Sequence, residues 1–561
     1  MEDALNFNHY FPNDELFDLL DEWVSTYPNL IQKKSIGNSH EGRPIWLVTL
    51  TNQTTGTDLD KPAIWIDANI HATEITGTTS AVYIIYRLLK EYGENEQITR
   101  QLDQNVYYIV PRVNPDGAEW AMATTPRYVR SGVRPYPWEE KDEGLLAQDI
   151  NGDGKILQMR IQDPNGDWKI SSLDSRMMEK RTPDEVGGQY YRLLPEGLLE
   201  DYDGYIIKMS RPLEGLDFNR NFPFQWRTEG EQQGAGPYPA SEPEIHALVD
   251  FIIKHPNINI AVTFHTFSRV ILRPYSTKSD EDMNTDDLWV YKKIGALGTK
   301  ITGYRCVSTY HDFKYHPKEV ATGAFDDWMY DHLGVFAYTI ELWDLPTEAG
   351  IKDRKWIEWW RDHPHEEDLQ IFKWTEAHAA SDAYFDWKSY DHPQLGKVEL
   401  GGWNNMYTWR NPPLDFVESE VKTHYPYILS LGEMLPHLAI YSLKISRVSD
   451  NKFHLNLVVE NSGFLPSYTS QQCKIRQASR PVRVELLIPD NAYLTSGKHR
   501  TELGYLEGRS NKIDLAAPYG ESPTDNRARL EWVIEASPGT KIGIRILSER
   551  AGNITREVIL H

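Results

Sequence analysis

Short apolar segments that suit buried strands alternate with amphipathic helices, and this alternation constrains the fold more than any other feature of the sequence. Ala63–Asn69 is an apolar run of strand length, and Ile75–Tyr92 follows it with apolar residues on one helical face. Strands that alternate with helices predict a parallel or mixed sheet covered on both faces. Further predicted strands are Val106–Val110, Ile258–Phe264 and Val335–Leu342, and further predicted helices are Glu242–Lys254, Asp286–Thr302 and Val417–Leu435.

Three stretches depart from this pattern. Residues 135–216 are rich in Gly, Pro, Asp and Arg, and we interpret them as a long insertion in the α/β unit without a core of its own. Residues 344–413 are crowded with tryptophan, which favours core packing, with a peptide or sugar groove as the alternative. Beyond Pro436 the sequence changes to short alternating runs between turn residues, which is typical of a β-sandwich. We therefore expect an α/β domain over residues 1–435 and a β-sandwich over residues 436–561.

The charge balance excludes some partners. The formal net charge of −23 over 561 residues disfavours nucleic acid and anionic membranes, because phosphate surfaces repel most of such a molecule. No segment approaches the roughly 18 apolar residues of a membrane span. The N-terminus carries acidic residues where a signal peptide carries basic ones, and two cysteines form no disulfide framework. A cytoplasmic location is the expectation, and a trimmed or non-standard export signal is the alternative.

Three side chains that can bind a metal stand where predicted strands end. His71 and Glu74 follow the strand at Ala63–Asn69, and His265 follows Ile258–Phe264. Functional groups collect at the carboxyl ends of strands in α/β sheets. Two histidines and one glutamate leave a fourth position open on zinc, which is the catalytic type of site. Taken singly, each residue also fits a polar helix start or a hydrogen-bonded core position.

Glu341 lies in the apolar run FAYTIELWD. A carboxylate among apolar neighbours is costly unless it is paired or placed near a cation. A general base beside a metal-activated water meets this condition. A glutamate paired at the edge of the sheet is the alternative.

Five motifs occur in a familiar order: His71-x-x-Glu74, NPDG at Asn114–Gly117, LDFNRNFP at Leu216–Pro223, FHTFS and TIELWD. Over about residues 15–435 this order resembles the zinc metallocarboxypeptidases of the carboxypeptidase A and B type. The resemblance implies the mixed-sheet α/β fold of that family. It also implies a zinc ion that activates water to hydrolyse the C-terminal bond of peptides or proteins.

The resemblance also implies roles for individual residues. His71, Glu74 and His265 match the zinc ligands, and Glu341 matches the general base. Arg130 matches the residue that polarises the scissile carbonyl, with Arg127 and Arg134 as alternatives.

Residues that bind the end of the substrate are implied in the same way. Asn219 and Arg220 match the pair that binds the terminal carboxylate, a task suited to the planar fork of arginine. Tyr315 is the match for the tyrosine that caps the substrate, with Tyr310 as the substitute. Asp326 lies as far before Glu341 as the pocket-floor aspartate of carboxypeptidase B, which implies a preference for basic C-terminal residues. Pairing with arginines or helix capping is the alternative for Asp326.

A second metal site is predicted inside the insertion. Asp149, Asn151 and Asp153 place oxygen ligands at positions one, three and five of a calcium-type loop over residues 149–160, followed by Gly154 at the turn. Position twelve is Arg160, where a complete loop of this type has glutamate. An ordinary Asp/Asn/Gly turn is the alternative.

The sequence therefore predicts a zinc-dependent carboxypeptidase. Two other functions stay open. The same site could trim cell-wall or γ-glutamyl peptides, which also end in a carboxylate. The chain could instead be an inactive peptide-binding protein that acts through its β-domain, although binding alone needs no base such as Glu341.

Overall fold

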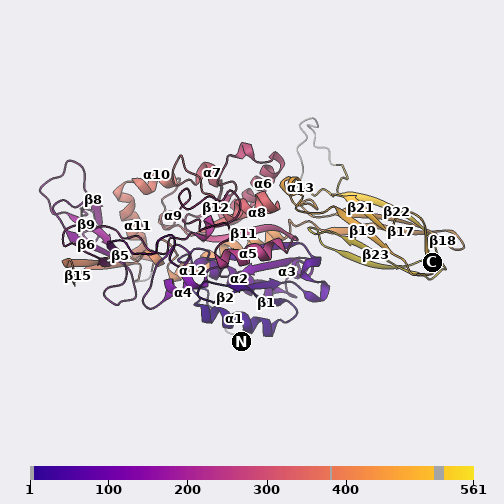
Figure 1. Ribbon diagram of the computed structural model, residues 1–561, viewed down its shortest axis with the longest axis horizontal. Coiled ribbons are helices and arrows are strands. Elements are labelled where there is room, and N and C mark those ends of the chain that lie inside the picture. Colours follow the sequence, from indigo (N-terminus) through magenta and orange to yellow (C-terminus); the bar gives the residue numbers. More distant parts are fainter. Residues whose placement is uncertain (1–4, 380–381, 511–522) are drawn as a thin grey trace.

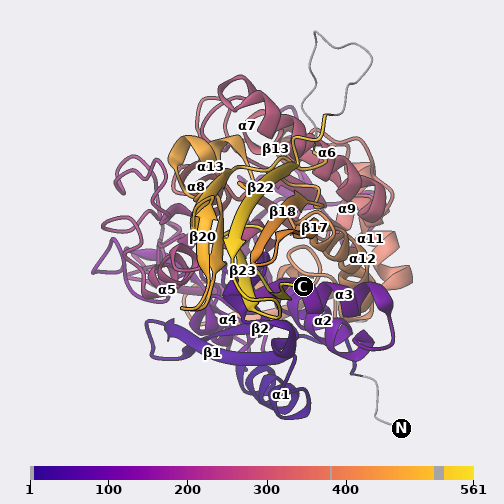
Figure 2. The same ribbon diagram turned by 90° about the vertical axis from the view of Figure 1, so that its right-hand side faces the viewer.

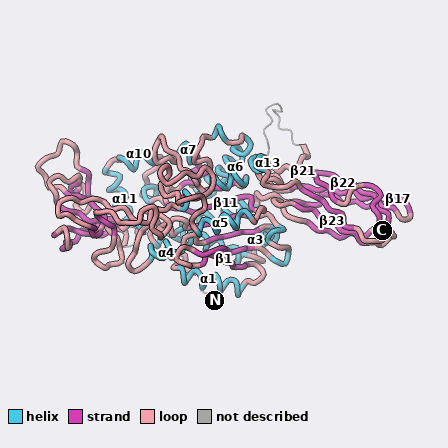
Figure 3. The backbone as a smooth tube through the Cα atoms, in the orientation of Figure 1, coloured by secondary structure: helices cyan, strands magenta, loops and turns pink. Residues whose placement is uncertain are grey.

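The computed structural model of the chain describes residues 5–379, 382–510 and 523–561. The molecule is elongated and has three parts in a row (Figure 1). An α/β body lies in the middle, a small sheet of the insertion lies at one end, and the C-terminal β-domain lies at the other. Figure 3 shows the same division, because helices gather in the middle, whereas the two ends contain strands and loops.

The middle part is built on an eight-stranded mixed sheet. Its strands, in spatial order, are β1 (Ile31–Asn38), β2 (Pro44–Leu50), β4 (Val106–Val110), β3 (Ala63–Ala68), β11 (Ile258–Thr266), β14 (Phe336–Leu342), β12 (Val270–Arg273) and β13 (Arg305–Ser308). Strands β4, β3, β11 and β14 are parallel, so their carboxyl ends meet at one edge. The predicted mixed sheet is confirmed, and its predicted strands differ from these four only at their ends.

Helices cover both faces of this sheet. They are α1 (Asn13–Thr26), α2 (Thr76–Glu91), α3 (Glu96–Gln104), α4 (Pro115–Met122), α5 (Pro243–Ile253), α6 (Thr285–Thr302), α7 (Thr309–Asp312), α8 (Phe325–Leu333) and α12 (Leu414–Gly432). Side chains alternate between the faces of a strand, so Trp65 and Ala68 of β3 point to opposite sides. Ala68 meets α2 so closely that a Cβ on Gly77 would lie 3.1 Å from the Ala68 Cβ. The Trp65 ring packs 5.9 Å from that of Phe251 in α5.

The predicted helices correspond to α2, α5, α6 and α12 and are confirmed. Across the described ranges, no helix is both long and apolar enough to cross a membrane.

The insertion packs a small separate core together with residues 384–403, so the prediction that it takes part in no separate core is wrong. Its sheet contains, in spatial order, β15 (Tyr384–His392), β16 (Gly396–Trp403), β6 (Gln158–Gln162), β9 (Tyr191–Pro195), β7 (Trp168–Ile170) and β8 (Met178–Lys180), beside a pair formed by β5 (Gly144–Ala147) and β10 (Gly197–Glu200). Leu145, Met159 and Leu199 of the insertion are buried against Val398 and Leu400 of β16. Because two segments far apart in the sequence supply this core, neither segment alone has a hydrophobic pattern that predicts it.

The tryptophan-rich segment mainly packs a core, as predicted. It contains α9 (Leu345–Glu348), α10 (Trp356–Arg361) and α11 (His365–His378). Trp343 and Trp359 are buried in a cluster of their own, and Trp374, Trp403 and Trp409 pack against it. The tryptophan-rich segment also contains β15 and β16, and β16 pairs with β6 of the insertion. This segment therefore joins the insertion sheet to the middle part.

The C-terminal part is a β-sandwich, as predicted, and Figure 2 views the molecule from this end. One sheet contains β17 (Leu438–Ser449), β18 (Lys452–Asn461), β22 (Arg527–Glu535) and β20 (Tyr493–Ser496), and the other contains β21 (Arg500–Gly504), β19 (Val482–Leu487), β23 (Lys541–Leu547) and β24 (Ile554–Ile559). Leu455 and Trp532 of the first sheet share a core with Val484 and Ile544 of the second. A short helix, α13 (Gln471–Arg476), contacts α8 of the middle part.

The β-domain contacts the middle part at the amino ends of the parallel strands. The guanidinium of Arg550 donates hydrogen bonds to the carbonyl oxygens of Ile258 and, at 2.7 Å, Leu333. The Ser470 hydroxyl donates to the carbonyl oxygen of Gly334 at 2.7 Å. Ile258 begins β11 and Gly334 lies just before β14. The β-domain therefore lies at the edge of the sheet opposite the strand carboxyl ends.

Candidate active site

The loop after β3 brings two of the candidate metal ligands together. Asn69 adopts a left-handed conformation with φ of 58°, which asparagine tolerates better than most residues. Its side-chain amide donates to the carbonyl oxygens of His71 at 2.7 Å and Ala72 at 3.3 Å. The turn is thereby fixed, and Nδ1 of His71 lies 2.9 Å from Oε1 of Glu74.

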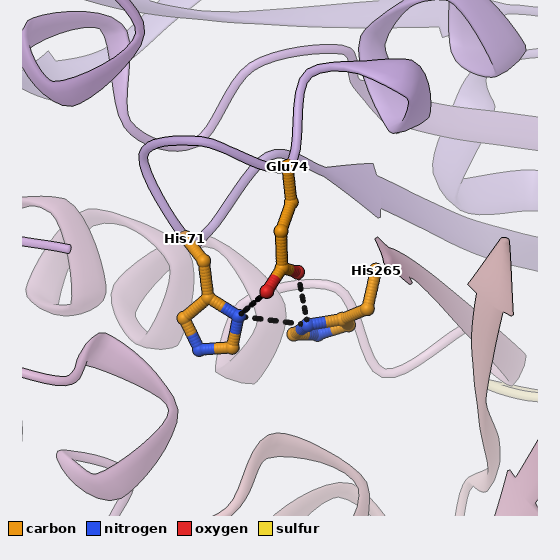
Figure 4. A group of neighbouring side chains, drawn as sticks. All are labelled: His71, Glu74 and His265. Carbon is orange, nitrogen blue, oxygen red and sulfur yellow. Dashed lines mark hydrogen bonds and ion pairs between the residues drawn. The ribbon is translucent and has the colours of Figure 1, made fainter. Parts of the chain in front are cut away.

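His265 completes the cluster from β11. Its Nδ1 atom lies 3.0 Å from Oε2 of Glu74 and 3.1 Å from Nδ1 of His71 (Figure 4). All three side chains are buried. Within the described part of the chain, this is the one group of His, Cys, Asp and Glu side chains that converges closely enough to hold a metal ion.

The three side chains fit a zinc ion. Their ligand atoms lie within 4.8 Å of one another, and two nitrogens with one carboxylate leave a coordination position open. Burial lowers the pKa of His265, which favours the neutral imidazole that binds metals. Burial alone would raise the pKa of Glu74, but His71 and His265 outweigh it and hold that pKa well below its usual range. Glu74 therefore offers a charged carboxylate.

Asp217, which the sequence analysis missed, orients His71. Its Oδ1 atom lies 3.1 Å from Nε2 of His71, and its Oδ2 atom accepts a hydrogen bond from Nε of Arg130 at 3.0 Å. Burial opposes ionisation of Asp217, but Arg130, Arg220 and His71 hold its pKa well below its usual range. A carboxylate behind a ligating histidine fixes the ring and raises its basicity. Its position in the LDFNRNFP motif was the available signal.

Arg130 reaches the cluster from a separate loop. Its guanidinium donates to Oε1 of Glu74 at 3.1 Å, and its carbonyl oxygen accepts a hydrogen bond from the Ala72 amide at 3.0 Å. The NPDG motif supports this loop, because the side-chain amide of Asn114 donates to the carbonyl oxygen of Ser131 at 2.7 Å. The arginine loop and the metal-binding turn are therefore built as one unit.

The two alternative arginines take other partners. Arg127 pairs with Glu214 at 3.0 Å and lies over the Trp120 ring. Arg134 makes a two-bond pair with Glu242, at 2.7 and 2.8 Å. Of the three arginines, the structure brings Arg130 to the cluster.

Glu341 lies beside His265. Strands β14 and β11 are parallel neighbours, and their register pairs Glu341 with His265 directly. Strand β14 is inside the sheet, between β11 and β12, so the alternative of a glutamate at the sheet edge is wrong. No described lysine, arginine or histidine forms an ion pair with Glu341. Burial raises its pKa well above the usual range, and the charge of Glu74 adds to this effect.

A cavity of about 150 Å³ opens next to the cluster, which is room for about one side chain. Asn219 and Arg220 line it from the short helix η3 (Phe218–Arg220). Oδ1 of Asn219 accepts a hydrogen bond from the Phe325 amide at 2.8 Å, which fixes the side chain and leaves its NH₂ group for a ligand. The lining also includes His71, Arg130, His265, Leu272, Ser276, Thr309, Tyr315, Asp326, Thr339 and Glu341.

The family model for zinc carboxypeptidases matches residues 16–359, which is more than half of the chain. The chain belongs to the zinc carboxypeptidase family. A second model, described as a domain of unknown function, matches residues 437–559.

Several carboxypeptidases are similar to the chain. Mouse carboxypeptidase A1 is 25% identical over 348 residues, which cover 61% of this chain and 64% of that protein. Rat carboxypeptidase A2 is 26% identical over 383 residues, covering 64% of this chain and 72% of its own. Carboxypeptidase B of Astacus astacus is 26% identical over 345 residues, covering 61% and 88%. The chain thus spans less than two thirds of mouse carboxypeptidase A1.

Among solved structures, thrombin-activatable fibrinolysis inhibitor overlaps with 76% of this chain and 74% of its own at 18% identity, with a TM-score of 0.43. Carboxypeptidase A from Helicoverpa armigera overlaps with 67% and 75% at 17% identity, with a TM-score of 0.41.

Two tyrosines are candidates for the capping residue in this zinc carboxypeptidase family member. Tyr315 lines the cavity and is 55% exposed. Tyr310 is not part of the lining, and Lys314 lies over its ring. The structure therefore places Tyr315, and not Tyr310, at the cavity.

Asp326 and Asp327 differ in their surroundings. The carboxylate of Asp327 accepts the backbone amide of Ser276 on both oxygens, at 2.8 and 3.0 Å. Asp326 instead lines the cavity, where burial raises its pKa to about 6. No described arginine forms an ion pair with Asp326, so the pairing alternative is not observed.

The calcium-type loop lies in the insertion, outside the cavity. Oδ1 and Oδ2 of Asp149 accept the amides of Gly152 and Gly154, at 2.7 and 2.8 Å. Oδ1 of Asn151 accepts the amide of Asp153 at 2.8 Å. These bonds are those of an Asp/Asn/Gly turn. Arg160, at position twelve, pairs with Glu399 at 2.8 Å.

Proposed function

We propose that the chain is a zinc-dependent metallocarboxypeptidase that hydrolyses the C-terminal bond of peptides or proteins. One observation carries the proposal: the cluster of His71, Glu74 and His265 lies beside Glu341 at a cavity that also presents Arg220. Membership of the zinc carboxypeptidase family supports it.

His71, Glu74 and His265 would hold the zinc ion, which supplies Lewis acidity and activates water. Glu341 accepts a proton from the attacking water and returns it to the leaving amine. Its raised pKa suits a group that must both take and give a proton. Arg130 donates to the carbonyl oxygen of the scissile bond as negative charge develops there. Asp217 holds both His71 and Arg130 in place.

Recognition of the free C-terminus falls to Asn219 and Arg220. The guanidinium of Arg220 can bind both oxygens of a carboxylate, and the NH₂ group of Asn219 adds a donor. Because the cavity has room for about one side chain, only the last residue enters it. Tyr315 covers the bound residue from the exposed side.

A preference for basic C-terminal residues is part of the proposal. Asp326 lines the cavity without an ion-pair partner among the described residues. A carboxylate there attracts a lysine or arginine side chain and repels an acidic one.

Three further predictions from the sequence remain proposals. They are the cytoplasmic location, the absence of nucleic-acid and membrane partners, and a calcium ion at Asp149, Asn151 and Asp153. The alternative functions are trimming of cell-wall or γ-glutamyl peptides, and peptide binding without turnover.

The test compares peptides that differ only in a free or an amidated C-terminus. We expect cleavage of the last bond in the free peptides and none in the amidated ones. Glu341→Gln should keep the zinc and the melting temperature but lower kcat by about 10²–10⁴-fold, because glutamine cannot accept the proton. His265→Ala should lower the zinc content.

Cleavage of amidated peptides, or a Glu341→Gln variant within a few-fold of the parent, would refute the proposal. Cell-wall and γ-glutamyl peptides in the same panel separate the related hydrolases. Binding without turnover in the zinc-loaded parent would identify a binding protein.

A further inference from the structure

Arg410 lies beside the metal-binding cluster although it comes from beyond the family match, which ends at residue 359. The next residue, Asn411, fixes its position. Oδ1 of Asn411 accepts the amide and the hydroxyl of Thr76, at 3.1 and 2.8 Å, and its Nδ2 donates to the carbonyl oxygen of Thr73 at 2.7 Å. Thr73 and Thr76 flank Glu74. The segment that carries Arg410 is therefore tied to the turn that carries a metal-ligand candidate.

The guanidinium of Arg410 has no partner within the described ranges, neither a hydrogen bond nor an ion pair. The side chain is partly buried, and the ionisable groups that act on it most are Glu74, Arg130, Tyr315 and Glu341, in that order. Burial lowers its pKa. Removing a charge from water without a partner is costly, and a ligand carboxylate would supply that partner.

The other two arginines of the site differ in this respect. Arg130 is held by Glu74 and Asp217, and the guanidinium of Arg220 donates to the carbonyl oxygen of Asn219 at 2.6 Å. Arg410 is thus the arginine at the cluster whose donors are all available.

Arg410 also lies outside the cavity. The cavity lining includes Arg130 and Arg220 but not Arg410. Its neighbour Asn411 is bonded to the turn at Thr73–Thr76, which carries Glu74. If the last residue of a substrate fills the cavity, Arg410 faces the part of the substrate that precedes the scissile bond.

Apolar packing holds the backbone at this position. Trp409 packs against Trp360 and Trp403, with ring centroids 5.4 and 5.5 Å apart. A rigid base reduces the entropy lost when the guanidinium orders on a ligand.

We propose that Arg410 binds a carboxylate on the acyl side of the scissile bond, so that peptides with an acidic penultimate residue are preferred substrates. This inference rests on the proposed carboxypeptidase function. Arg410 would thus determine specificity and take no part in the chemistry, because it would contact the substrate away from the reacting atoms.

The test uses N-blocked peptides with the same last residue and either Glu or Gln before it. Gln has nearly the same shape as Glu but no charge, so the Glu:Gln ratio of kcat/KM isolates the carboxylate. We expect a ratio on the order of ten in the parent. It should fall to about one in Arg410→Gln and keep part of its value in Arg410→Lys.

Arg127→Gln is the matched control. It removes the same charge from an exposed arginine that pairs with Glu214, and it should leave the ratio unchanged. The melting temperature of each variant is compared with that of the parent. If Arg410→Gln does not fold, Arg410→Lys carries the test, because a point charge cannot reproduce the two-bond fork and the ratio must still drop.

A binding measurement gives a second readout. The dissociation constants of the same peptides, measured by calorimetry with zinc-loaded Glu341→Gln protein, should show the same Glu preference and lose it with Arg410→Gln. A parent ratio near one overturns the proposal, as does a ratio that Arg410→Gln leaves unchanged. An equal loss for both peptides overturns it too, because Arg410 would then bind a main-chain carbonyl. If the parent cleaves no peptide yet binds with the predicted ratio, the carboxypeptidase function fails and the Arg410 site stands.

Discussion

Asp326 and Asp327 are neighbours in the sequence, but the fold gives their carboxylates different tasks. Asp327 accepts both of its short hydrogen bonds from the Ser276 amide and so anchors the loop after β12. Asp326 faces the cavity, where a substrate side chain can reach it. Two identical side chains on the first turn of α8 therefore separate into a structural residue, Asp327, and a proposed recognition residue, Asp326.

The proposed preference for basic C-terminal residues should depend on pH. Burial raises the pKa of Asp326 to about 6, so its carboxyl group is charged above that pH and neutral below it. The attraction for a basic side chain is therefore present above about pH 6 and lost as the pH falls through that value. The measurement is the ratio of kcat/KM for Arg-ending peptides to that for Leu-ending peptides. It is taken between about pH 5 and about pH 8, at intervals of about one pH unit. Effects on zinc binding and on Glu341 cancel in this ratio.

Asp326→Asn should make the ratio low at every pH. Asp327→Asn should keep the ratio and its pH dependence but lower the melting temperature, because one acceptor of a buried amide is lost. A pH-dependent ratio in Asp326→Asn would assign the effect to another group.

At this scale the sequence predicted the cluster residues His71, Glu74 and His265, which the structure brings together. Asp217 and Arg410 could not be found in the same way. The position of Asp217 depends on its contact with His71, and the role proposed for Arg410 depends on the bond between its neighbour Asn411 and Thr73. Residue type and local spacing do not predict such contacts, and the position of Asp217 in the LDFNRNFP motif was the one signal that the sequence offered for it.

Among the elements, the buried strands were the easiest to predict and their ends the hardest. The apolar run predicted a strand over 258–264, whereas β11 continues to Thr266. Backbone hydrogen bonds extend a strand regardless of hydropathy, so His265 lies within the ladder and is paired with Glu341. This pairing sets the distance between a metal-ligand candidate and the proposed base.

The insertion sheet shows the opposite case. Its strand β6 pairs with β16, which follows more than two hundred residues later in the chain. Each strand is short and only partly apolar, so neither predicts the sheet without the other.

The calcium-type loop leads into β6 and offers a prediction for this element. If calcium binds at Asp149, Asn151 and Asp153, added calcium should raise the melting temperature of zinc-loaded protein, since a ligand that binds only the folded state stabilises it. The difference with and without calcium should vanish in Asp153→Ala.

Magnesium at the same concentration is the control, because its preference for octahedral geometry suits such a loop poorly. Equal melting temperatures with and without calcium in the parent would leave the loop as an Asp/Asn/Gly turn.

For the whole molecule, the sequence predicted the α/β body and the β-sandwich but not how they meet. The interface combines apolar packing, in which Leu465 of the β-domain joins the core of the middle part, with single polar contacts, such as those of Arg550 with the carbonyl oxygens of Ile258 and Leu333. No hydrophobic pattern marks such contacts in advance.

Arg550→Ala should destabilise the protein without impairing catalysis. The change leaves two carbonyl oxygens without their donor and costs about 1–3 kcal/mol for each buried group. Because the contacts lie at the amino ends of β11 and β14, kcat/KM should stay within a few-fold of the parent. Calorimetry and peptide kinetics on the same samples measure both effects.

Arg480→Ala is the control, since Arg480 is exposed and its pair with Glu549 should contribute little. Loss of activity in folded Arg550→Ala protein would show that the β-domain acts on the site across the sheet.

The size of the cavity has a consequence for the products. With room for about one side chain in the cavity, the proposed carboxypeptidase would free one residue at each cut, and the penultimate residue would become the new end of the peptide. That new end must enter the same cavity, so the residue that favours the first cut decides whether a second one follows. On the proposed specificities, a peptide that ends in Glu-Arg loses its arginine and then offers a glutamate, which Asp326 repels. Trimming of such a peptide would stop after a single residue, and the product would keep a C-terminal glutamate.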